Sequence, residues 1–512
     1  MEMTTNPFFT HYENNETSSQ CPIQFFSSLF PDTSALHITD PLDISKLQKI
    51  ETVNQRLTQT ASDKIKKGTL TYETLNLLID QTSECLISHA KNTKIIGIYS
   101  KNPLTIILIL FACVRLKKIA FPLNFRLPTI NSIITENKIG FLFTDVTLTA
   151  QTDCNTSIFD LTQVIKRYSH VSKRPQSNAK ETRSLSKFQW STMIQTSGTS
   201  GKPKTAVHRL ENYISSSLSS SKAMTLKSSN NWLLSLPLFH VGGIFILFRM
   251  FCVGGSVTLL NKKKSLSSYL NDTLVTHLSL VPTQLNTLID DIQDSSDTSI
   301  FSSLKCILLG GSPAPESLLN DAASLQLPIF PTYGLTEMTA QVTHNNILMS
   351  EKLIQIKDNE ICVKGNSLFE GYWNGITCYL PLNNEDYFQT GDIGKINKST
   401  LIIKGRLDNM FISGGENIHP EEIEDILINQ PFVKQVIVVP IHSKTYGEIP
   451  VAFLDVSENK EFQLVSKLVS EYLLNNLPKF KCPTHYFKMP TLEHQFKHSR
   501  KTLKLLAEDN LK

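Results

Sequence analysis

The sequence predicts an α/β protein, in which a large N-terminal domain of mixed sheets flanked by helices carries a β-rich subdomain and is followed by a small C-terminal α+β domain. Three observations lead to this prediction. The chain has 512 residues, 40% of them hydrophobic, which is enough for more than one core. Strand-like and helix-like runs alternate through most of the chain, as they do in α/β proteins. From Glu360 the runs become short and separated by turns, and a further unit begins past Asp408.

The order of the patterns divides the chain into three parts. Residues 1–40 lack sustained periodicity and are rich in Asn, Thr and Ser, so we expect a loosely ordered extension. Residues 41–407 form the large domain and residues 408–512 the C-terminal domain. The first 20 residues lack the basic start and apolar core of a signal peptide.

The first elements of the large domain alternate in type. Helical spacing over Tyr72–Ala90 is followed by a β-rich run over Lys94–Tyr99, and a second β-rich run covers Gly140–Thr144. Between them lies the longest apolar run, Pro103–Val114. It is well short of the roughly 20 residues that cross a bilayer, so it predicts a buried helix and no membrane span.

The second half of the large domain repeats a strand, loop and helix order. Residues 169–186 are basic and serine-rich and predict a solvated loop. The β-rich subdomain that starts at Glu360 ends at Leu401–Gly405. Four strand-like runs each precede turn or helix signals: Trp232–Leu236, Ser256–Leu260, Thr276–Val281 and Lys305–Leu309.

The C-terminal unit begins with a helix. Pro420 suits the first helical position, and the acidic Glu421 and Glu422 suit the positive end of the helix dipole. Two β-rich runs, 433–439 and 451–456, and a helix over 464–476 follow. Together they predict a compact α+β unit of about 100 residues.

Charge and cysteine usage narrow the function classes. The 50 basic and 46 acidic residues give a net charge of +4 and are spread along the chain, which disfavours a nucleic-acid binder and favours a small-molecule partner. The nine cysteines are scattered and form no CxxC pair, so neither a disulfide framework nor a zinc site is indicated. We therefore expect a reducing compartment, the cytoplasm.

A loop from Thr196 to Lys204 has the composition of a phosphate site. Glycines let backbone N–H groups approach an anion, hydroxyls add short donors, and lysine adds a mobile positive charge. It is not the usual NTPase loop, because only two residues separate its glycines and proline follows Lys202. Its inner residues are Ser197, Gly198, Thr199, Ser200 and Gly201.

Further motifs follow this loop in a specific order. They are Leu236-Pro237-Leu238-Phe239-His240, Gly310-Gly311-Ser312, Tyr333-Gly334-Leu335-Thr336-Glu337, Thr390-Gly391-Asp392, Gly405-Arg406-Leu407-Asp408-Asn409 and Gly414-Gly415-Glu416-Asn417. The order and spacing resemble the adenylate-forming superfamily of acyl-CoA synthetases, adenylation domains and luciferases, over most of the chain from about Leu70 onward. The resemblance implies an enzyme that uses ATP and Mg²⁺ to adenylate a carboxylic acid, releases pyrophosphate, and transfers the acyl group to CoA.

The resemblance also implies roles for the nucleotide-binding residues. The loop from Thr196 would receive the β- and γ-phosphates, with Lys204 at the matching lysine position. Thr336 would contact the AMP phosphate and Glu337 would hold Mg²⁺, a hard cation that prefers carboxylate oxygens. Six further positions, also by resemblance, form an adenosine site: Tyr333 stacks on adenine opposite Gly310, Gly311 and Ser312, Asp392 binds the ribose, and Arg406 is its partner.

The C-terminal domain would be a mobile lid that turns about a hinge near Asp408. In family members a lysine near the C-terminus bridges the substrate carboxylate and the α-phosphate, and Lys497 holds the matching place here. Because the usual preceding glycine is missing, Lys501 and Lys504 are competitors. The glycine pair Gly414 and Gly415 is similar to the loop that replaces this lysine in the thioester step.

Two residues point to the acyl pocket. By resemblance, His240 lines it. Arg249 lies within the otherwise apolar run Ile244–Cys252, where a lone charge is costly to bury. Either an internal acid neutralises Arg249 or a second carboxylate of the substrate does; the sequence leaves both open.

Within the superfamily, three details resemble the o-succinylbenzoate-CoA ligases of menaquinone biosynthesis. They are the segment Leu236 to Arg249, the run 279–285 (Ser-Leu-Val-Pro-Thr-Gln-Leu) and the ending 496–500 (Phe-Lys-His-Ser-Arg). Such a substrate has two carboxylates, which would explain the arginine. Alternatives are another acyl- or aryl-CoA synthetase for a monocarboxylic acid, a carrier-protein-loading adenylation module, and a nucleotide-binding pseudoenzyme. A homodimer is one option for the assembly.

Overall fold

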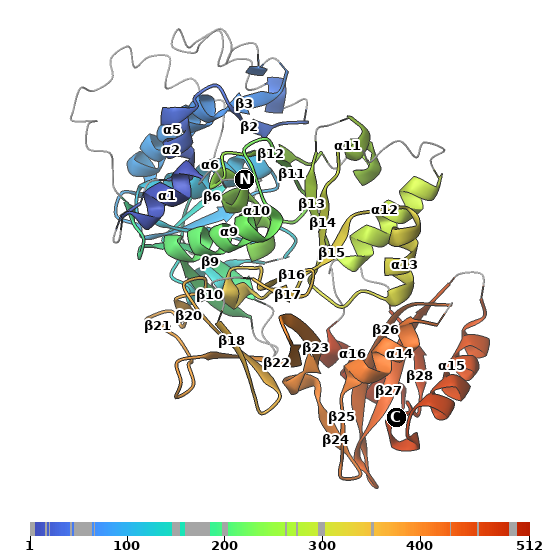
Figure 1. The fold of residues 1–512 in the computed structure, drawn as a ribbon. Helices are drawn as coiled ribbons and strands as arrows, with labels where there is room; N and C mark the ends of the chain where they lie inside the picture. Colours follow the sequence, from blue (N-terminus) through green and yellow to red (C-terminus); the bar gives the residue numbers. More distant parts are fainter. Residues whose placement is uncertain are drawn as a thin grey trace.

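The fold is described from a computed structural model of the chain (Figure 1). The described residues are 6–15, 18–19, 21–40, 43–45, 64–65, 67–127, 129–145, 154–158, 185–196, 203–261, 264–272, 275–294, 303–349, 353–430, 432–457, 460–490 and 499–511. They form sheets of eight, seven, six and five strands and one two-stranded pair. The predicted α/β class is confirmed.

The seven-stranded sheet is mostly parallel, and β3 pairs antiparallel with β2 at its edge. The four strand-like runs predicted between Trp232 and Leu309 are its strands β11 to β14, each within two residues of the expected bounds. In sheet order the strands are β15 (Ile329–Pro331), β14 (Cys306–Leu309), β13 (His277–Leu280), β11 (Asn231–Leu234), β12 (Ser256–Leu259), β2 (Ser34–His37) and β3 (Thr69–Thr71).

The eight-stranded sheet joins the N-terminal strands to the hairpin that carries the phosphate-loop sequence. Strands β9 and β10 pair antiparallel, and β20 continues the sheet on the far side of β10. In order the strands are β21 (Cys378–Tyr379), β20 (Gly371–Trp373), β10 (Lys204–Arg209), β9 (Trp190–Thr196), β5 (Ile119–Pro122), β4 (Ile95–Tyr99), β6 (Phe141–Thr144) and β7 (Asn155–Ile158).

Helices between the two large sheets form the main core. The apolar run predicted as a buried helix is α6 (Pro103–Arg115), which Asn102 caps by accepting from two backbone N–H groups. α6 packs on β5 and β9, and α10 (Val241–Phe251) packs on β11 and β12. The Phe111 and Phe248 rings, 5.3 Å apart, join these helices. α5 (Tyr72–Ala90) packs on α6, and α9 (Leu210–Met224) on α10.

The outer face of the seven-stranded sheet has its own hydrophobic cluster. It is covered by α11 (Leu266–Asp272), α12 (Pro282–Asp294) and α13 (Glu316–Ser324), and a further helix, α7 (Asn131–Glu136), packs beside the eight-stranded sheet. Among the described helices none is both long and apolar enough to cross a membrane.

The prediction of a loosely ordered extension over residues 1–40 is wrong for the residues that the structure describes. They form α1 (Pro7–Glu13), β1 (Ser18–Ser19, paired with β8, Leu185–Ser186), α2 (Pro22–Leu29) and β2. The Phe8 and Phe25 rings are buried and meet edge to face at 5.3 Å, and Phe26 packs on Tyr72. Aromatic burial against the large domain supplies the order that local periodicity did not indicate.

The six-stranded sheet matches the predicted β-rich subdomain only in part, with β22 and β23 as its longest hairpin. In order its strands are β16 (Thr343–His344), β17 (Ile347–Leu348), β23 (Thr400–Arg406), β22 (Phe388–Asn397), β19 (Glu360–Lys364) and β18 (Leu353–Lys357). Strands β16 to β18 precede the predicted start at Glu360, and β20 and β21, within the predicted range, join the eight-stranded sheet. The short 3₁₀ helix η3 (Leu407–Asn409) leads out of it.

The chain beyond η3 forms a separate sheet with helices on both faces (Figure 1, orange to red). Its strands are β25 (Glu416–Ile418), β24 (Phe411–Ser413), β27 (Gly447–Val456), β26 (Val433–Ser443) and β28 (Tyr486–Lys488), with the turn η4 (Lys479–Lys481). α14 (Pro420–Ile428) and α15 (Phe462–Asn476) pack on one face, and α16 (Arg500–Asn510) on the other. The predicted helix at Pro420 begins at that residue.

Candidate active site

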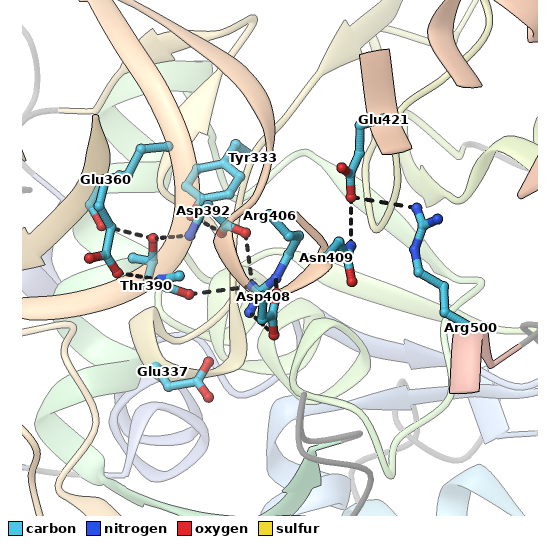
Figure 2. Close-up of polar contacts among 12 residues, drawn as sticks. Tyr333, Glu337, Glu360, Thr390, Asp392, Arg406, Asp408, Asn409, Glu421 and Arg500 are labelled. Carbon is cyan, nitrogen blue, oxygen red and sulfur yellow. Dashed lines mark hydrogen bonds and ion pairs between the residues drawn. The ribbon is translucent and has the colours of Figure 1, made fainter. Parts of the chain in front are cut away.

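The centre of the candidate site is a buried carboxylate on the β22–β23 hairpin. Asp392 on β22 lies opposite Arg406 on β23, and its side chain accepts from Arg406 Nη1 at 2.8 Å and from the Tyr333 hydroxyl (Figure 2). Burial raises the pKa of Asp392, and these two hydrogen bonds oppose the rise. The structure therefore brings together three residues that the motifs placed in an adenosine site.

Glu360 on β19 binds the backbone next to Asp392. The sequence motifs did not indicate this residue. Its side chain is buried and accepts from the Gly391 N–H at 2.7 Å and from Gln389 at 2.8 Å. Gly391 has φ +73°, and a Cβ there would lie 2.9 Å from Arg406 Nη2. The positive φ therefore favours glycine in this turn between Glu360 and Arg406.

The Thr336 and Glu337 motif forms a one-turn 3₁₀ helix, η2 (Thr336–Met338). A Cβ on Gly334 would lie 1.6 Å from the Ala340 carbonyl oxygen, so the turn closes only with glycine at that position. Glu337 Oε1 accepts from the Tyr372 hydroxyl at 2.6 Å, and Oε2 accepts no hydrogen bond from a described residue. A carboxylate with one oxygen held and one open fits the chemistry of Mg²⁺.

His208 on β10 makes a hydrogen bond to the η2 turn that carries Thr336 and Glu337. It is fully buried, and its Nε2 donates to the Thr336 carbonyl at 2.8 Å. Burial lowers the pKa of His208 to about 4, against the opposing effect of this hydrogen bond. The ring is therefore neutral, with the proton on Nε2, and it fixes the backbone of Thr336.

We expect the fold to lose stability in mild acid. His208 and His277 each have a folded-state pKa of about 4, lowered by burial and, for His277, also by Arg249. Between pH 6.5 and 4 the unfolded chain binds protons there that the folded chain does not, so the free energy of unfolding falls as pH falls. At pH 5 one such histidine costs about 2 kcal/mol.

Urea unfolding at pH 7 and pH 5 checks this expectation. His208→Gln keeps an N–H for the Thr336 carbonyl but does not titrate, so its loss of stability between the two pH values should be smaller than that of the wild type. An equal loss in both proteins would contradict the assigned pKa.

The phosphate-loop sequence connects β9 to β10, and its two ends are described. Thr196 ends β9 opposite Lys204, the first residue of β10. The Lys204 ammonium lies 4.7 Å from the centre of the Tyr372 ring. The inner loop, from Ser197 to Gly201, lies outside the described residues, so its phosphate role stays a prediction.

The glycine turn after β14 lies next to the same region. The Gly310 N–H donates to the Leu280 carbonyl, and a Cβ on Gly310 would lie 2.9 Å from Thr332 Cγ2. This brings Gly310, Gly311 and Ser312 beside the strand end that leads into Tyr333. The adenine site predicted between the turn and the ring is compatible with this packing.

The two residues expected in the acyl pocket lie on one helix but in different environments. His240 is the N-cap of α10, is exposed, and contacts Phe239. Arg249 lies near the end of α10 with 3% of its surface exposed. At 1.5 Å per residue the two positions are separated by most of the helix length, so they do not form one cluster.

Arg249 is held by neutral groups. Its Nε donates to Ser220 Oγ at 2.8 Å and its Nη2 to Gln341 Oε1 at 2.9 Å, and the guanidinium lies 4.4 Å from the Trp232 ring and 4.3 Å from the Phe245 ring. No described carboxylate oxygen lies within 4.0 Å of it, so the internal acid that the sequence left open is not among the described residues. Burial lowers the pKa of Arg249 to about 9.

The junction with the C-terminal unit is a chain of polar contacts (Figure 2). Asp408 pairs with Arg406 at 2.9 Å, and Asn409 donates to Glu421 of α14. Arg500, the first residue of α16, contacts Glu421 at 3.4 Å and forms a two-point ion pair with Glu424. Lys497, three residues earlier, lies outside the described residues.

The glycine pair of the C-terminal unit forms the tip of a hairpin. Gly414 and Gly415 connect β24 to β25 with φ of +58° and +91°, and the Gly414 N–H donates to the Tyr446 carbonyl. A Cβ on Gly415 would meet nothing within 4 Å. The space beside Gly415 is therefore open, and the approach of this tip to CoA stays a prediction.

Two family models match the chain. Residues 51–373 match the AMP-binding enzyme family, and residues 422–495 match the AMP-binding enzyme C-terminal domain. The first match alone covers more than half of the 512 residues.

Curated relatives include two enzymes with the same name. The 2-succinylbenzoate–CoA ligase of Haemophilus influenzae is 36% identical over 326 residues, which cover 62% of this chain and 70% of that protein. The 2-succinylbenzoate–CoA ligase of Salmonella typhimurium is 35% identical over 307 residues, 58% of this chain and 64% of that protein. The aligned regions thus span about two thirds of these relatives.

Solved structures extend the likeness over nearly the whole chain. The o-succinylbenzoate CoA synthetase of Bacillus subtilis in complex with the acyl-adenylate intermediate OSB-AMP has a TM-score of 0.77 at 25% identity, covering 96% of this chain and 99% of that chain. The same enzyme in complex with ATP and magnesium ion has a TM-score of 0.74 at 24% identity, with 93% and 97% covered.

Proposed function

This chain belongs to the AMP-binding enzyme family, and we propose that it is an ATP-dependent acid–thiol ligase that converts o-succinylbenzoate to its CoA thioester. One observation carries the proposal. Lys204, Asp392 and the motif that carries both Tyr333 and Glu337 come from three separate segments, and they are linked in space through Tyr372 and the β22–β23 hairpin. Relatives named 2-succinylbenzoate–CoA ligase support the substrate.

The first half-reaction joins two anions. A carboxylate oxygen of the acid attacks the α-phosphorus of ATP, and pyrophosphate leaves with the electron pair of the broken P–O bond. Lys204 and Lys497 supply positive charge at the phosphates and the attacking carboxylate, where it stabilises the transition state. Mg²⁺, when bound, would neutralise phosphate charge, and Glu337 would hold it.

The nucleotide must be held during both steps. Asp392 already accepts two hydrogen bonds, but a carboxylate has about four lone-pair sites, which leaves capacity for the ribose hydroxyls. Tyr333 packs beside it and would carry the adenine on its ring. In the second half-reaction the CoA sulfur attacks the acyl carbon and loses its proton to solvent, the bond between the acyl carbon and the AMP oxygen breaks, and AMP leaves with that electron pair, giving the thioester.

Arg249 is the residue that favours a diacid. It is a buried cation with neutral partners, and its Nη1 donates to no described residue. A second carboxylate on the substrate would satisfy that donor and neutralise the charge. A monocarboxylic acid has no second carboxylate to pair with Arg249, so we expect the site to bind o-succinylbenzoate more tightly.

A substrate panel tests the proposal. We expect pyrophosphate release to depend on o-succinylbenzoate, and thioester formation to require CoA. A better rate with monocarboxylic acids would favour another acyl- or aryl-CoA synthetase. Acyl transfer to a carrier protein, with no free CoA thioester, would favour a carrier-loading adenylation module.

Arg249→Leu tests the diacid assignment. We expect the KM for o-succinylbenzoate to rise by about tenfold to a hundredfold, since a charge-assisted hydrogen bond contributes about 1.5–3 kcal/mol. The KM for an analogue that lacks the second carboxylate should change much less. Arg249→Lys keeps the charge but loses the two-armed geometry of the guanidinium, so its KM for o-succinylbenzoate should lie between those of the wild type and Arg249→Leu.

Thermal unfolding of the same variants is the control, because Arg249→Leu also leaves Ser220 and Gln341 without the donor that they share. If a folded variant binds both substrates with equal loss, Arg249 is a structural residue and the second carboxylate is bound elsewhere.

The nine cysteines, all described, are free thiols. This state is the usual one in a reducing compartment, which supports a cytoplasmic location.

A further inference from the structure

Tyr372 on β20 lies between the two opposite charges that the proposed chemistry needs most. Its hydroxyl donates to Glu337 Oε1 at 2.6 Å, and its ring face lies 4.7 Å from the Lys204 ammonium. The side chain is 6% exposed. Lys204 and Glu337 themselves form no ion pair within 4.0 Å.

The backbone explains why Tyr372 reaches both groups. β20 pairs antiparallel with β10, and Tyr372 lies opposite Ala206, two residues beyond Lys204 and on the same face of the sheet. Side chains in such diagonal positions can touch across two strands. Glu337 approaches from the other side, where the Phe369 N–H donates to its carbonyl oxygen at 2.8 Å. Residues 369–372 therefore hold both the backbone and the side chain of Glu337.

The packing around Tyr372 leaves the ring little freedom. Phe369 meets it edge to face at 4.8 Å, and the Phe388 ring lies 6.5 Å away. Because an ionised carboxylate only accepts hydrogen bonds, the Tyr372 hydroxyl is the donor in its contact with Glu337.

We propose that Tyr372 is a positioning residue that fixes the Glu337 carboxylate with its free oxygen available for Mg²⁺ and, by its ring, keeps Lys204 from pairing with Glu337. A direct Lys204–Glu337 ion pair would neutralise both groups and remove them from the metal and the phosphates. The ring attracts the ammonium only weakly, by a cation–π contact, so the lysine can move to an incoming anion. This role rests on the proposed assignment of Glu337 to Mg²⁺.

The two parts of the role are separable by substitution. Tyr372→Phe removes the hydroxyl and keeps the ring, whereas Tyr372→Leu removes both. The matched control is Tyr379→Phe on the neighbouring strand: its ring lies 5.9 Å from that of Tyr372, it is exposed, and its hydroxyl does not contact Glu337. Thermal unfolding establishes which variants are folded.

Calorimetric titration with ATP, in excess Mg²⁺ and in EDTA, tests the proposal. Tyr372→Phe should weaken binding of Mg·ATP by about tenfold, as expected for a lost hydrogen bond to a charged group, with little effect on ATP in EDTA. Tyr372→Leu should weaken both, because Lys204 is then free to pair with Glu337. Tyr379→Phe should change neither.

A double-mutant cycle gives the sharper test. In a Glu337→Gln background, Tyr372→Phe should have little further effect on Mg·ATP binding, because the carboxylate that it orients is gone. Two results would overturn the proposal. One is that Tyr372→Phe loses ATP affinity equally with and without Mg²⁺, and the other is that its loss of Mg·ATP affinity is fully additive with that of Glu337→Gln. Pyrophosphate release by the wild type is a separate measurement: a wild type that binds Mg·ATP as described but activates no carboxylic acid would refute the proposed function and leave the role of Tyr372 standing.

Discussion

Replacing Lys497 by alanine is expected to slow acyl-adenylate formation by about 10²–10³-fold, the usual cost of losing one electrostatic contact to a transition state. Thioester formation from preformed acyl adenylate should be largely intact. The lysine charge is needed only when the carboxylate and the α-phosphate, both anionic, are brought together. Single-turnover assays of each half-reaction measure the two rates.

The neighbouring lysines are the controls for this prediction. Lys504 is already paired with Glu448 at 2.7 Å, and Lys501 is exposed on α16. Lys501→Ala and Lys504→Ala should therefore leave adenylation near the wild-type rate. If one of them abolishes adenylation in place of Lys497→Ala, that residue is the lid lysine; equal loss of both half-reactions in Lys497→Ala would refute the assigned role.

Asp408→Pro is expected to permit adenylation and to reduce the thioester step by about 10²-fold, the loss that a small misplacement of reacting groups can cause, because the lid could not complete its motion. Asp408 lies in the 3₁₀ helix η3, and the proline ring allows the φ of roughly −50 to −70° that is typical of such a helix. A backbone that must rotate there to present Gly414 and Gly415 would be locked in one conformation. Stopped assays of the two half-reactions, with thermal unfolding as a check, measure the difference.

Asp408→Ala is the matched control, because it also removes the ion pair with Arg406 but leaves the backbone free. The thioester step should be much faster in the alanine variant than in the proline variant. Similar rates in both would show that the lost carboxylate, and not backbone rotation, is responsible; wild-type turnover in Asp408→Pro would place the hinge elsewhere.

Local patterns correctly predicted the helices and strands that the sequence analysis named within residues 72–476, with errors of at most four residues at their ends. α5 has the predicted bounds, α6 ends one residue beyond the apolar run, and α14 begins at Pro420. Helix spacing, first-turn proline and β-rich runs are properties of a few adjacent residues, so they can be recognised without tertiary contacts. The prediction of a loosely ordered extension over residues 1–40 was wrong for the described residues. Their aromatic side chains become ordered by packing on partners distant in sequence, such as Tyr72.

The motifs also predicted which residues would form the adenosine site, and Tyr333, Asp392 and Arg406 do lie together. The residues that hold the motifs in place were missed. Tyr372 is 35 positions from its acceptor Glu337, and His208 is 128 positions from Thr336. Nothing within a few residues of Tyr372 or His208 marks either as a partner of the Thr-Glu turn.

Arg249 shows most clearly the difference between what its own sequence segment predicts and what distant parts of the fold determine. Its sequence neighbours alone establish that a charge must be buried in an apolar helix, because no residue of α10 could pair with it. Its partners are Gln341, 92 positions away, Ser220 on α9 and the Trp232 ring on β11. The cost of burying a charge is a property of the residue and its local segment, whereas the groups that offset the cost are set by how distant segments pack. The sequence alone therefore predicted that Arg249 needs a partner, either an internal acid or a second substrate carboxylate. The tertiary structure was needed to show that neutral groups contact the guanidinium.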